Sequence, residues 1–213
     1  MRGLLTLPFR RDREVKCIEE KIQAIQNALD EKVKEIQQIV GEKNFNFKDF
    51  YFAGGCIYCL WNDKEVKDYD IFCKSYYAIN KLKKFFKENP DKSDITTSNA
   101  ITMGKYQFVI KHIGQPDVEV AKFDFKHNCY YYDNTGLHDL YGFEYINDNK
   151  LHFNSDRARD ILNVVTRIPK FVNRGMEISQ KEILDILEMG TRPSKIFRER
   201  RAIKQRRSGR SRY

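Results

Sequence analysis

The stretch DFYFAGGCIYCLWNDKEVKDYDIFCKS, residues 49–75, decides the expected fold of this chain. The aromatic run Phe50–Phe52 predicts the end of a buried strand, and the pair Gly54-Gly55 follows it directly. Residues 56–61 are apolar and predict a turn or two of helix, and residues 68–73 predict a second strand after a charged loop. The pattern is therefore strand, glycine turn, short helix and strand.

Two carboxylates share one face of the second predicted strand. Successive side chains on a strand point to opposite faces, so Asp68 and Asp70 lie on one side and Tyr69 lies on the other. Neighbouring carboxylates repel each other and lose hydration when they are buried, so a counter-ion is expected between them. Mg²⁺ or Mn²⁺ suits such hard oxygen ligands, and Mg²⁺ binds one or two carboxylates together with substrate phosphates.

The glycine pair predicts a phosphate site beside these carboxylates. Glycine allows a sharp turn and a close approach of the backbone to a ligand, and a helix start offers free N–H groups to phosphate. Twelve residues separate Gly55 from Asp68. A phosphate cradle just ahead of a carboxylate pair is what nucleotidyl transfer from a nucleoside triphosphate requires.

On these residues the chain resembles the nucleotidyltransferase superfamily, which includes DNA polymerase beta, poly(A) polymerases and CCA-adding enzymes. The resemblance implies a mixed sheet with flanking helices, an α+β fold, and a third carboxylate on a later strand. Asp124, between Phe123 and Phe125, fits that position. The resemblance implies that Asp68, Asp70 and Asp124 bind metal and catalyse, and that Asp124 helps to deprotonate the acceptor hydroxyl. The alternative for Asp124 is an ordinary surface acid on a half-exposed strand.

A second set of residues resembles small nucleotidyltransferase-like proteins of large phages and giant DNA viruses, over roughly residues 45–190. This resemblance implies that Ser98 and Asn99 contact the nucleotide together with Gly54 and Gly55. One feature differs from CCA-adding enzymes, because Cys56 to Cys59 occupies the place where those enzymes have an arginine soon after the glycines. The segments that carry the resemblance are residues 98–102, 123–129, 151–154 and 166–175.

Composition limits the other classes of function. The chain has 213 residues, which is one sizeable domain with appendages, and no apolar run approaches the ~18 residues of a membrane span. The apolar patch in residues 1–8 is too short for a signal peptide. Five cysteines without a regular spacing fit a reducing compartment. We therefore expect a cytoplasmic protein, in the host cytoplasm or the virion if the protein is viral.

The net charge of +9 is concentrated at the C-terminus. Residues 195–213 hold nine basic residues and one acid, so the rest of the chain is close to neutral. Such a tail is typically disordered and binds polyanions by counter-ion release, and we expect it to bind nucleic acid; the alternative is a solvated tail without a specific partner. Besides Lys195, the basic residues are Arg198, Arg200, Arg201, Lys204, Arg206, Arg207, Arg210 and Arg212.

Hydrophobic spacing predicts the remaining helices and strands and divides the chain into four parts. The segments are an N-terminal helix (1–44), a nucleotidyltransferase-like domain (45–154), a helical C-terminal part (155–192) and the basic tail (193–213). The expected elements are a helix over 11–40 ended by Gly41, a helix over 76–89 with Tyr77 inward, strands over 95–103, 106–112 and 118–132, and helices over 155–173 and 179–189. The apolar stripe of the first helix is Val15, Ile18, Ile22, Ile25, Leu29, Val33, Ile36 and Ile39, and it suits packing on the body or contact with a dimer partner.

Arg167 and Lys170 of the 155–173 helix, and Arg174 just after it, are spaced to lie along one side, near the phosphates of a nucleotide or the acceptor strand. The predicted function is metal-dependent transfer of a nucleoside monophosphate from a nucleoside triphosphate such as ATP to a hydroxyl acceptor, on nucleic acid such as an RNA or tRNA end. The main alternative is a catalytically silent protein of this fold that binds nucleic acid or serves in a virion. A toxin-like enzyme that modifies tRNA or protein shares the same site and differs in its acceptor.

Overall fold

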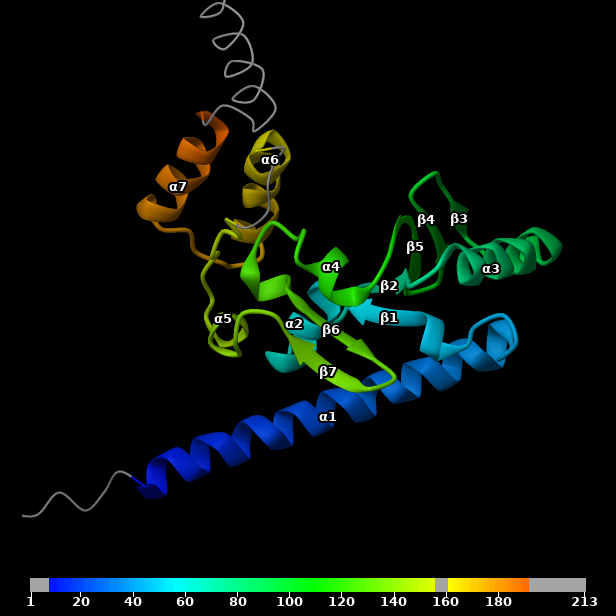
Figure 1. The fold of residues 1–213 in the computed structure, drawn as a ribbon, viewed down its shortest axis with the longest axis horizontal. Coiled ribbons are helices and arrows are strands. Elements are labelled where there is room, and N and C mark those ends of the chain that lie inside the picture. The colour runs from blue at the N-terminus through cyan, green and yellow to red at the C-terminus, as the bar shows by residue number, and fades with distance from the viewer. Residues whose placement is uncertain (1–7, 156–160, 192–213) are drawn as a thin grey trace, which may run out of the picture.

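The computed structural model describes residues 8–155 and 161–191, and Figure 1 shows how their elements are arranged. The basic tail, Arg198 to Arg212, lies outside the described residues. The helices are α1 (Pro8–Val40), α2 (Gly55–Trp61), α3 (Tyr76–Glu88), α4 (Pro116–Val120), α5 (Glu144–Asn147), α6 (Ile161–Val172) and α7 (Gln180–Thr191), with short 3₁₀ turns at Phe47–Asp49, Pro90–Lys92 and Lys126–Asn128. The strands are β1 (Phe50–Ala53), β2 (Tyr69–Cys73), β3 (Ile95–Thr96), β4 (Ala100–Met103), β5 (Tyr106–Ile113), β6 (Tyr130–Asp133) and β7 (Gly136–Asp139).

The strands form one seven-stranded mixed sheet in the order β3-β4-β5-β2-β1-β6-β7. β2 and β5 run parallel, and each other neighbouring pair in the sheet is antiparallel. The parallel register places Asp70 beside Gln107, and the antiparallel register places Phe52 beside Ile71. The mixed sheet with a long N-terminal helix and C-terminal helices confirms the predicted α+β fold class.

Strand alternation divides the sheet into two unlike faces. One face carries Phe52, Ile71 and Phe108, which are fully buried in the main core together with residues of α1, α2 and α3. The opposite face carries a smaller apolar cluster around Tyr51 and Phe72, which packs against α4 and the segment that follows it. Asp70 precedes Phe72 by two residues and therefore points to this less covered face.

The long helix α1 lies across the main core and ends where the sequence predicts (Figure 1). Gly41 adopts a positive φ of 83° and donates its N–H to the Gln37 carbonyl at 2.8 Å, which closes the helix. Over residues 15–40 of α1, the buried apolar side chains are Ile25, Leu29, Val33, Ile36 and Val40. The expectation that Ile39 belongs to the buried stripe is wrong, because Val40 takes that place. Val15, nearer the start of the helix, is half exposed.

Residues 118–132 do not form the predicted strand. The segment begins as helix α4, since Pro116 suits the first helical position and Asp117 favours the positive end of the helix dipole. A bend and a 3₁₀ turn follow, and regular strand geometry starts only at Tyr130. The aromatic alternation has another cause, because Phe125 is fully buried and makes an isolated bridge to Phe153.

The C-terminal helices pack against each other as a pair, α6 and α7. Gly175, with a φ of 85°, lies in the turn after α6, as predicted. The Ser179 hydroxyl caps α7 by accepting a hydrogen bond from the Glu182 N–H at 3.1 Å. The Glu182 carboxylate accepts from the Phe153 N–H at 2.9 Å, so it ties α7 to the body of the protein. No helix in the described ranges is long and apolar enough to cross a membrane.

Candidate functional site

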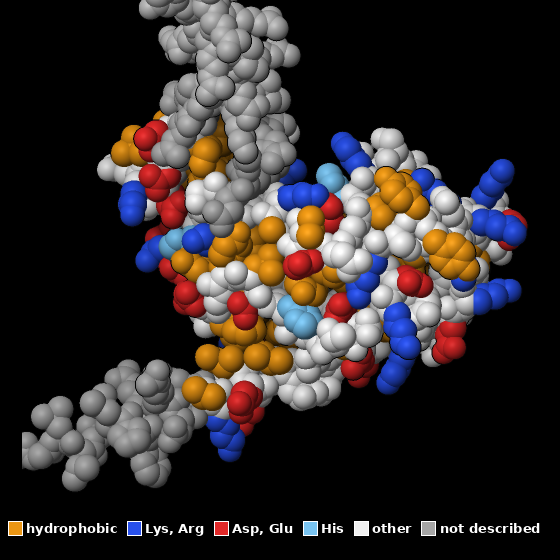
Figure 2. All heavy atoms as spheres, in the orientation of Figure 1, with side chains coloured by type: hydrophobic (Ala, Val, Ile, Leu, Met, Phe, Trp, Pro, Cys, Tyr) orange, Lys and Arg blue, Asp and Glu red, His pale blue; other side chains and the backbone are white. Residues whose placement is uncertain are grey.

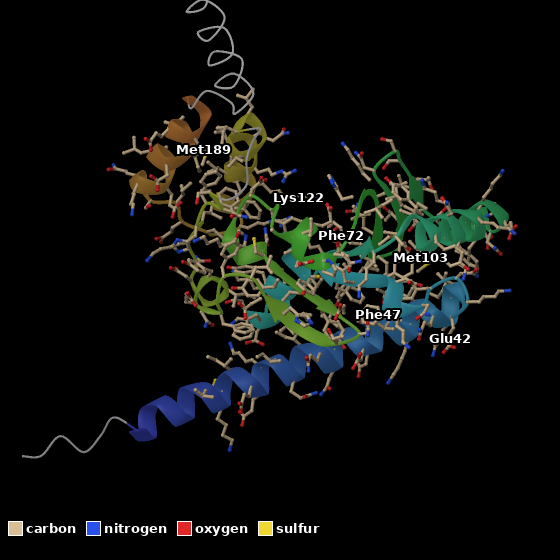
Figure 3. The ribbon with its side chains drawn as sticks, viewed as in Figure 1. Glu42, Phe47, Phe72, Met103, Lys122 and Met189 are labelled. Carbon is tan, nitrogen blue, oxygen red and sulfur yellow. The ribbon has the colours of Figure 1, made fainter. Side chains whose placement is uncertain are left out.

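The open face of the sheet forms one wall of a cavity of about 660 Å³. Its other walls are the segment after α4 and one side of α6. Figure 3 labels two of its lining residues, Phe72 on β2 and Lys122 after α4. The lining residues that the sequence predicted for a site are Gly54, Gly55, Asp68, Asp70, Asp124, Arg167, Lys170 and Arg174.

The two glycines join β1 to α2 at the rim of this cavity. Gly54 has a φ of 82° and a ψ of −135°, a conformation that is strained for any residue with a Cβ. Its N–H donates to the Tyr130 carbonyl at 3.3 Å, which holds the turn against β6. A Cβ at Gly55 would meet no atom within 4 Å, so the space in front of this backbone is open to a ligand.

Asp68 directly precedes β2 and is exposed, and Asp70 is the second residue of β2 and is half-buried. Burial, and after it the negative charge of Asp68, raise the pKa of Asp70 to about 6, while the positive charge of Lys170 acts in the opposite direction. The protein thus holds a carboxylate pair in which one member ionises at a higher pH than an ordinary aspartate does. Such a pair of hard oxygen donors fits a divalent cation, because the cation offsets the repulsion between the two carboxylates.

Asp124 lines the same cavity but lies on a bend and not on a strand. Its side chain is almost fully buried, and Arg167 Nη1 of α6 donates to its Oδ2. The backbone carbonyl of Asp124 accepts from the Asn154 N–H at 2.9 Å, which fixes the bend. Within the described ranges, no three or more His, Cys, Asp or Glu side chains are grouped closely enough to hold a metal ion. The structure therefore brings Asp124 to the cavity of Asp68 and Asp70 and joins it there to an arginine.

The basic side of α6 faces the carboxylates across the cavity. Arg167 and Lys170 lie on α6 and Arg174 lies in the turn directly after it, and all three line the cavity, as the sequence predicts. Since Lys170 lowers the pKa of Asp70, the positive charge of Lys170 stabilises the ionised form of that carboxylate. The cavity thus combines an acidic wall with a basic one, which suits a ligand that brings both phosphates and a metal ion.

Several lining residues were not predicted from the sequence. Gln107 lies beside Asp70 because β5 pairs with β2 in parallel, and a parallel register across a long crossover leaves no local signal in the sequence. Phe72 and Phe123 form an aromatic part of the wall, with ring centroids 5.8 Å apart. These side chains supply an apolar surface and an amide within the same cavity as the charged groups.

Ser98 and Asn99 lie elsewhere. They belong to the turn between β3 and β4, where the Asn99 carbonyl accepts from the N–H groups of Ile110 and Lys111 at 2.8 and 3.2 Å. Ser98 lines a second cavity of about 390 Å³ beside α3. The structure therefore separates this pair from the glycines and the carboxylates.

His127, close in sequence to Asp124, is buried among aromatic rings. Its centroid lies 5.0 Å from that of Phe171 and 5.1 Å from that of Tyr58. Within the described part of the chain, His127 Nδ1 has no hydrogen-bond partner. Burial lowers the pKa of His127 to about 3, and the charges of His152 and Lys64 act in the same direction. This histidine is a neutral core residue.

We expect His127 to make the fold acid-sensitive. An unfolded histidine takes up a proton near pH ~6.5, whereas His127 in the folded chain does so only near 3. Between these values the unfolded chain binds more protons, so stability falls as the pH is lowered from 6.5 towards 3. At pH 5 the expected loss is about 2 kcal/mol. Urea unfolding at pH 7.5 and 5.0 should show a smaller loss for His127→Phe than for the native chain, and an equal loss in both would contradict this.

Comparison with protein families gives one match. Residues 16–145 match the family described as the Gabija anti-defense 2 family protein. The matched stretch includes Gly54, Gly55 and all three aspartates, and it ends before α6. No curated protein matches the chain in sequence.

Comparison with solved structures gives CCA-adding enzymes. The Bacillus stearothermophilus CCA-adding enzyme in complex with CTP superposes with a TM-score of 0.56 and 19% identity, over 73% of this chain and 42% of that one. The Thermotoga maritima CCA-adding enzyme complexed with tRNA gives a TM-score of 0.51 and 14% identity, over 73% and 42% of the two chains. The chain thus spans less than half the length of these enzymes, and the similarity is one of fold.

Proposed function

Because the chain belongs to the Gabija anti-defense 2 family and has the fold of the CCA-adding enzyme head, we propose that it is a metal-dependent nucleotidyltransferase. It transfers a nucleoside monophosphate from a nucleoside triphosphate to a hydroxyl acceptor. The observation that carries this proposal is the cavity itself, with Gly54, Gly55, Asp68 and Asp70 on one side and the cations on and just after α6 on the other.

The triphosphate lies between the glycine turn and α6 in this proposal. Because the space in front of Gly55 is open, a phosphate group can approach its backbone closely. Lys170 and Arg174 neutralise the charge of the phosphates from the opposite wall. Phe72 and Phe123 offer an apolar surface to the base or sugar. Asp68 and Asp70 would hold a magnesium or manganese ion, which when bound neutralises charge on the phosphates and on the leaving pyrophosphate.

Asp124 and Arg167 act as a pair in this proposal. In the structure Arg167 is bound to the Asp124 carboxylate. We propose that Arg167 leaves Asp124 for a phosphate oxygen when the nucleotide binds, and that the carboxylate then accepts the proton of the acceptor hydroxyl. The proton moves to Asp124, and the acceptor oxygen bonds to the α-phosphorus as pyrophosphate leaves.

The acceptor proposed here is a hydroxyl on nucleic acid. CCA-adding enzymes are the structural relatives, and the basic residues from Arg198 to Arg212 favour a polyanionic partner. The description of the family further suggests that the transfer disables a component of the defence named Gabija. A protein hydroxyl is the competing acceptor, and the position of a transferred label distinguishes the two.

Nucleotide binding tests the proposal without knowledge of the acceptor. Each nucleoside triphosphate is titrated into the full chain, with and without Mg²⁺, and binding is measured by calorimetry. We expect binding of at least one nucleotide that Mg²⁺ strengthens, and the Asp68→Asn/Asp70→Asn variant should lose the Mg²⁺ effect. Failure of all nucleotides to bind at millimolar concentration would overturn the proposal.

The cations on and just after α6 give a further prediction. Lys170→Gln and Arg174→Gln should each weaken nucleotide binding about tenfold, because each removes a charge-assisted contact to phosphate. Lys181→Gln is the control, since Lys181 is exposed on α7 and does not line the cavity. Equal affinity in the three variants would show that α6 does not contact the nucleotide.

A second function, that of a catalytically silent binding protein, is favoured by two observations. Asp124 is bound to Arg167, and the described residues contain no group of three potential metal ligands. A silent protein keeps nucleotide or nucleic-acid binding without transfer. Binding that persists while no label reaches any acceptor would favour this function over the enzyme.

A further inference from the structure

The second cavity lies away from the candidate catalytic site, between α3 and the strands β3, β4 and β5. Its volume is about 390 Å³. The floor is apolar, with Phe86, Ile101 and Ile110, and the first two of these belong to the main core. These core residues lie on the sheet face opposite to Asp70, so the cavity is separate from the candidate catalytic site. The rim is Lys83, Lys87, Thr96, Thr97 and Ser98.

The outer side of α3 continues this cavity as an aromatic and basic surface. Tyr76 and Tyr77 are 73% and 66% exposed, although the sequence predicted Tyr77 to point inward. Tyr76, Lys83 and Lys87 follow helical spacing and lie along one stripe, which spans ~16 Å. Lys81, on the neighbouring stripe, places its Nζ 4.5 Å from the Tyr77 ring centroid. Figure 2 shows hydrophobic side chains exposed among Lys and Arg side chains over this part of the molecule.

The charge of this surface is positive. In the described residues, no carboxylate lies within ion-pair distance of Lys83 or Lys87, whereas Lys84 has Glu88 at 3.8 Å. The Thr97 hydroxyl is used within the turn, where it accepts from the N–H groups of Asn99 and Ala100. Lysines beside hydroxyl groups suit phosphate, and two exposed tyrosines suit a flat apolar group.

These features favour one class of ligand. Exposed aromatic rings next to lysines are how proteins hold single-stranded nucleic acid, because bases stack on the rings while the cations follow the phosphates. An acidic protein surface would match the lysines but would leave two tyrosine rings without a stacking partner. A duplex keeps its bases stacked inside and would match the lysines alone.

We infer that α3 and the β3–β4 turn form a binding surface for single-stranded nucleic acid, on the opposite face of the sheet from the catalytic cavity. The strand runs along Tyr76, Lys83 and Lys87, with a base on Tyr76 or Tyr77 and a phosphate at the rim of the second cavity. This surface acts independently of nucleotidyl transfer, so it stands whether or not the catalytic proposal does. It also gives Ser98 a role at the rim of the surface.

Photo-crosslinking tests the position of the strand. The full chain is irradiated with ten-nucleotide RNA and DNA strands that carry 5-iodouracil, and the attached residues are identified by mass spectrometry. We expect crosslinks at Tyr76 or Tyr77. Crosslinks confined to residues outside 76–110 would overturn the inference, because the basic tail would then account for all binding.

Substitution tests whether the tyrosine rings and the lysines bind the strand. The basic tail is present in every variant, so its contribution to the affinity is constant. Tyr76→Ala/Tyr77→Ala should weaken binding of the strand about tenfold, and Tyr76→Phe/Tyr77→Phe should restore it by keeping the rings. Lys83→Gln/Lys87→Gln should lower the slope of log affinity against log salt by about 1.4. The control is Lys34→Gln/Lys43→Gln, which removes two exposed lysines elsewhere.

Three results would contradict the inference. The first is that the alanine and glutamine variants bind the strand as tightly as the control does. The second is that polyglutamate competes as well as the unlabelled strand. The third is that a duplex of the same length binds more tightly than the strand. Circular dichroism melts of each variant check that these surface changes leave the fold intact. Each result is independent of the nucleotide-binding test at the catalytic cavity.

Discussion

Replacement of Asp70 by asparagine is expected to lower nucleotidyl transfer by ~10³-fold or more while the thermal midpoint Tm stays the same or rises. The physical reason lies in the pKa of Asp70, which burial and the Asp68 charge raise to about 6. An ionised carboxylate held in such a place is unfavourable for the fold at neutral pH, so removal of its charge relieves repulsion. Activity and stability should therefore change in opposite directions.

The measurement is label transfer and differential scanning calorimetry on the same protein preparations. Asp63→Asn is a matched control, because Asp63 lies in the loop between α2 and β2, is exposed and does not line the cavity. A large fall in Tm for Asp70→Asn would indicate that this carboxylate stabilises the fold. Full activity in Asp70→Asn would mean that the site is wrongly assigned.

Leu29→Ala is expected to lower the free energy of unfolding by about 3 kcal/mol, the largest effect on stability that we predict. Leu29 is fully buried near the middle of α1, within the main core. Truncation removes apolar contact and leaves a cavity that the neighbouring helix and sheet fill only in part. Urea unfolding monitored by the fluorescence of Trp61, which is also buried in that core, measures the loss.

Val15→Ala is the control on the same helix, with an expected loss of no more than about 0.5 kcal/mol, because Val15 is 50% exposed. Similar losses in the two variants would show that α1 does not pack on the core. Contact of α1 with a homodimer partner or another helix remains a proposal, and the half-exposed Val15 is available for it. Sedimentation of the native chain and Val15→Ala at several concentrations would measure that association.

The sequence was most informative where a local pattern carried the whole signal. Helical spacing predicted α1 and α3, and the glycine turn with the Asp68–Asp70 pair predicted the arrangement of β1, α2 and β2. Strand alternation then placed Asp70 on one face, because that rule depends only on neighbouring residues. The spacing of the basic residues likewise predicted that Arg167 and Lys170 of α6 and Arg174 just after it lie on one side, where all three line the cavity.

The failures involve forces from outside the local segment. Phe123 and Phe125 alternate as in a strand, yet Pro116 starts a helix and Phe125 is held by a bridge to Phe153, which lies 28 residues later. Gln107 reaches the cavity through a parallel register that no local pattern encodes. Ser98 and Asn99 lie beside α3 because the β3–β4 turn is at the far edge of the sheet from β1. Tyr77 is exposed because Ala78 and Ile79 fill the buried side of α3 at that turn.

The central claim is that this chain transfers nucleotides, and transfer itself tests it most directly. The full chain is incubated with Mg²⁺ or Mn²⁺, each α-labelled nucleoside triphosphate, and total RNA, DNA and protein, next to the Asp68→Asn/Asp70→Asn variant. We predict that label from at least one nucleotide reaches a nucleic acid with the native chain and not with the variant. Label on no acceptor, or label that the variant transfers equally well, would contradict the claim.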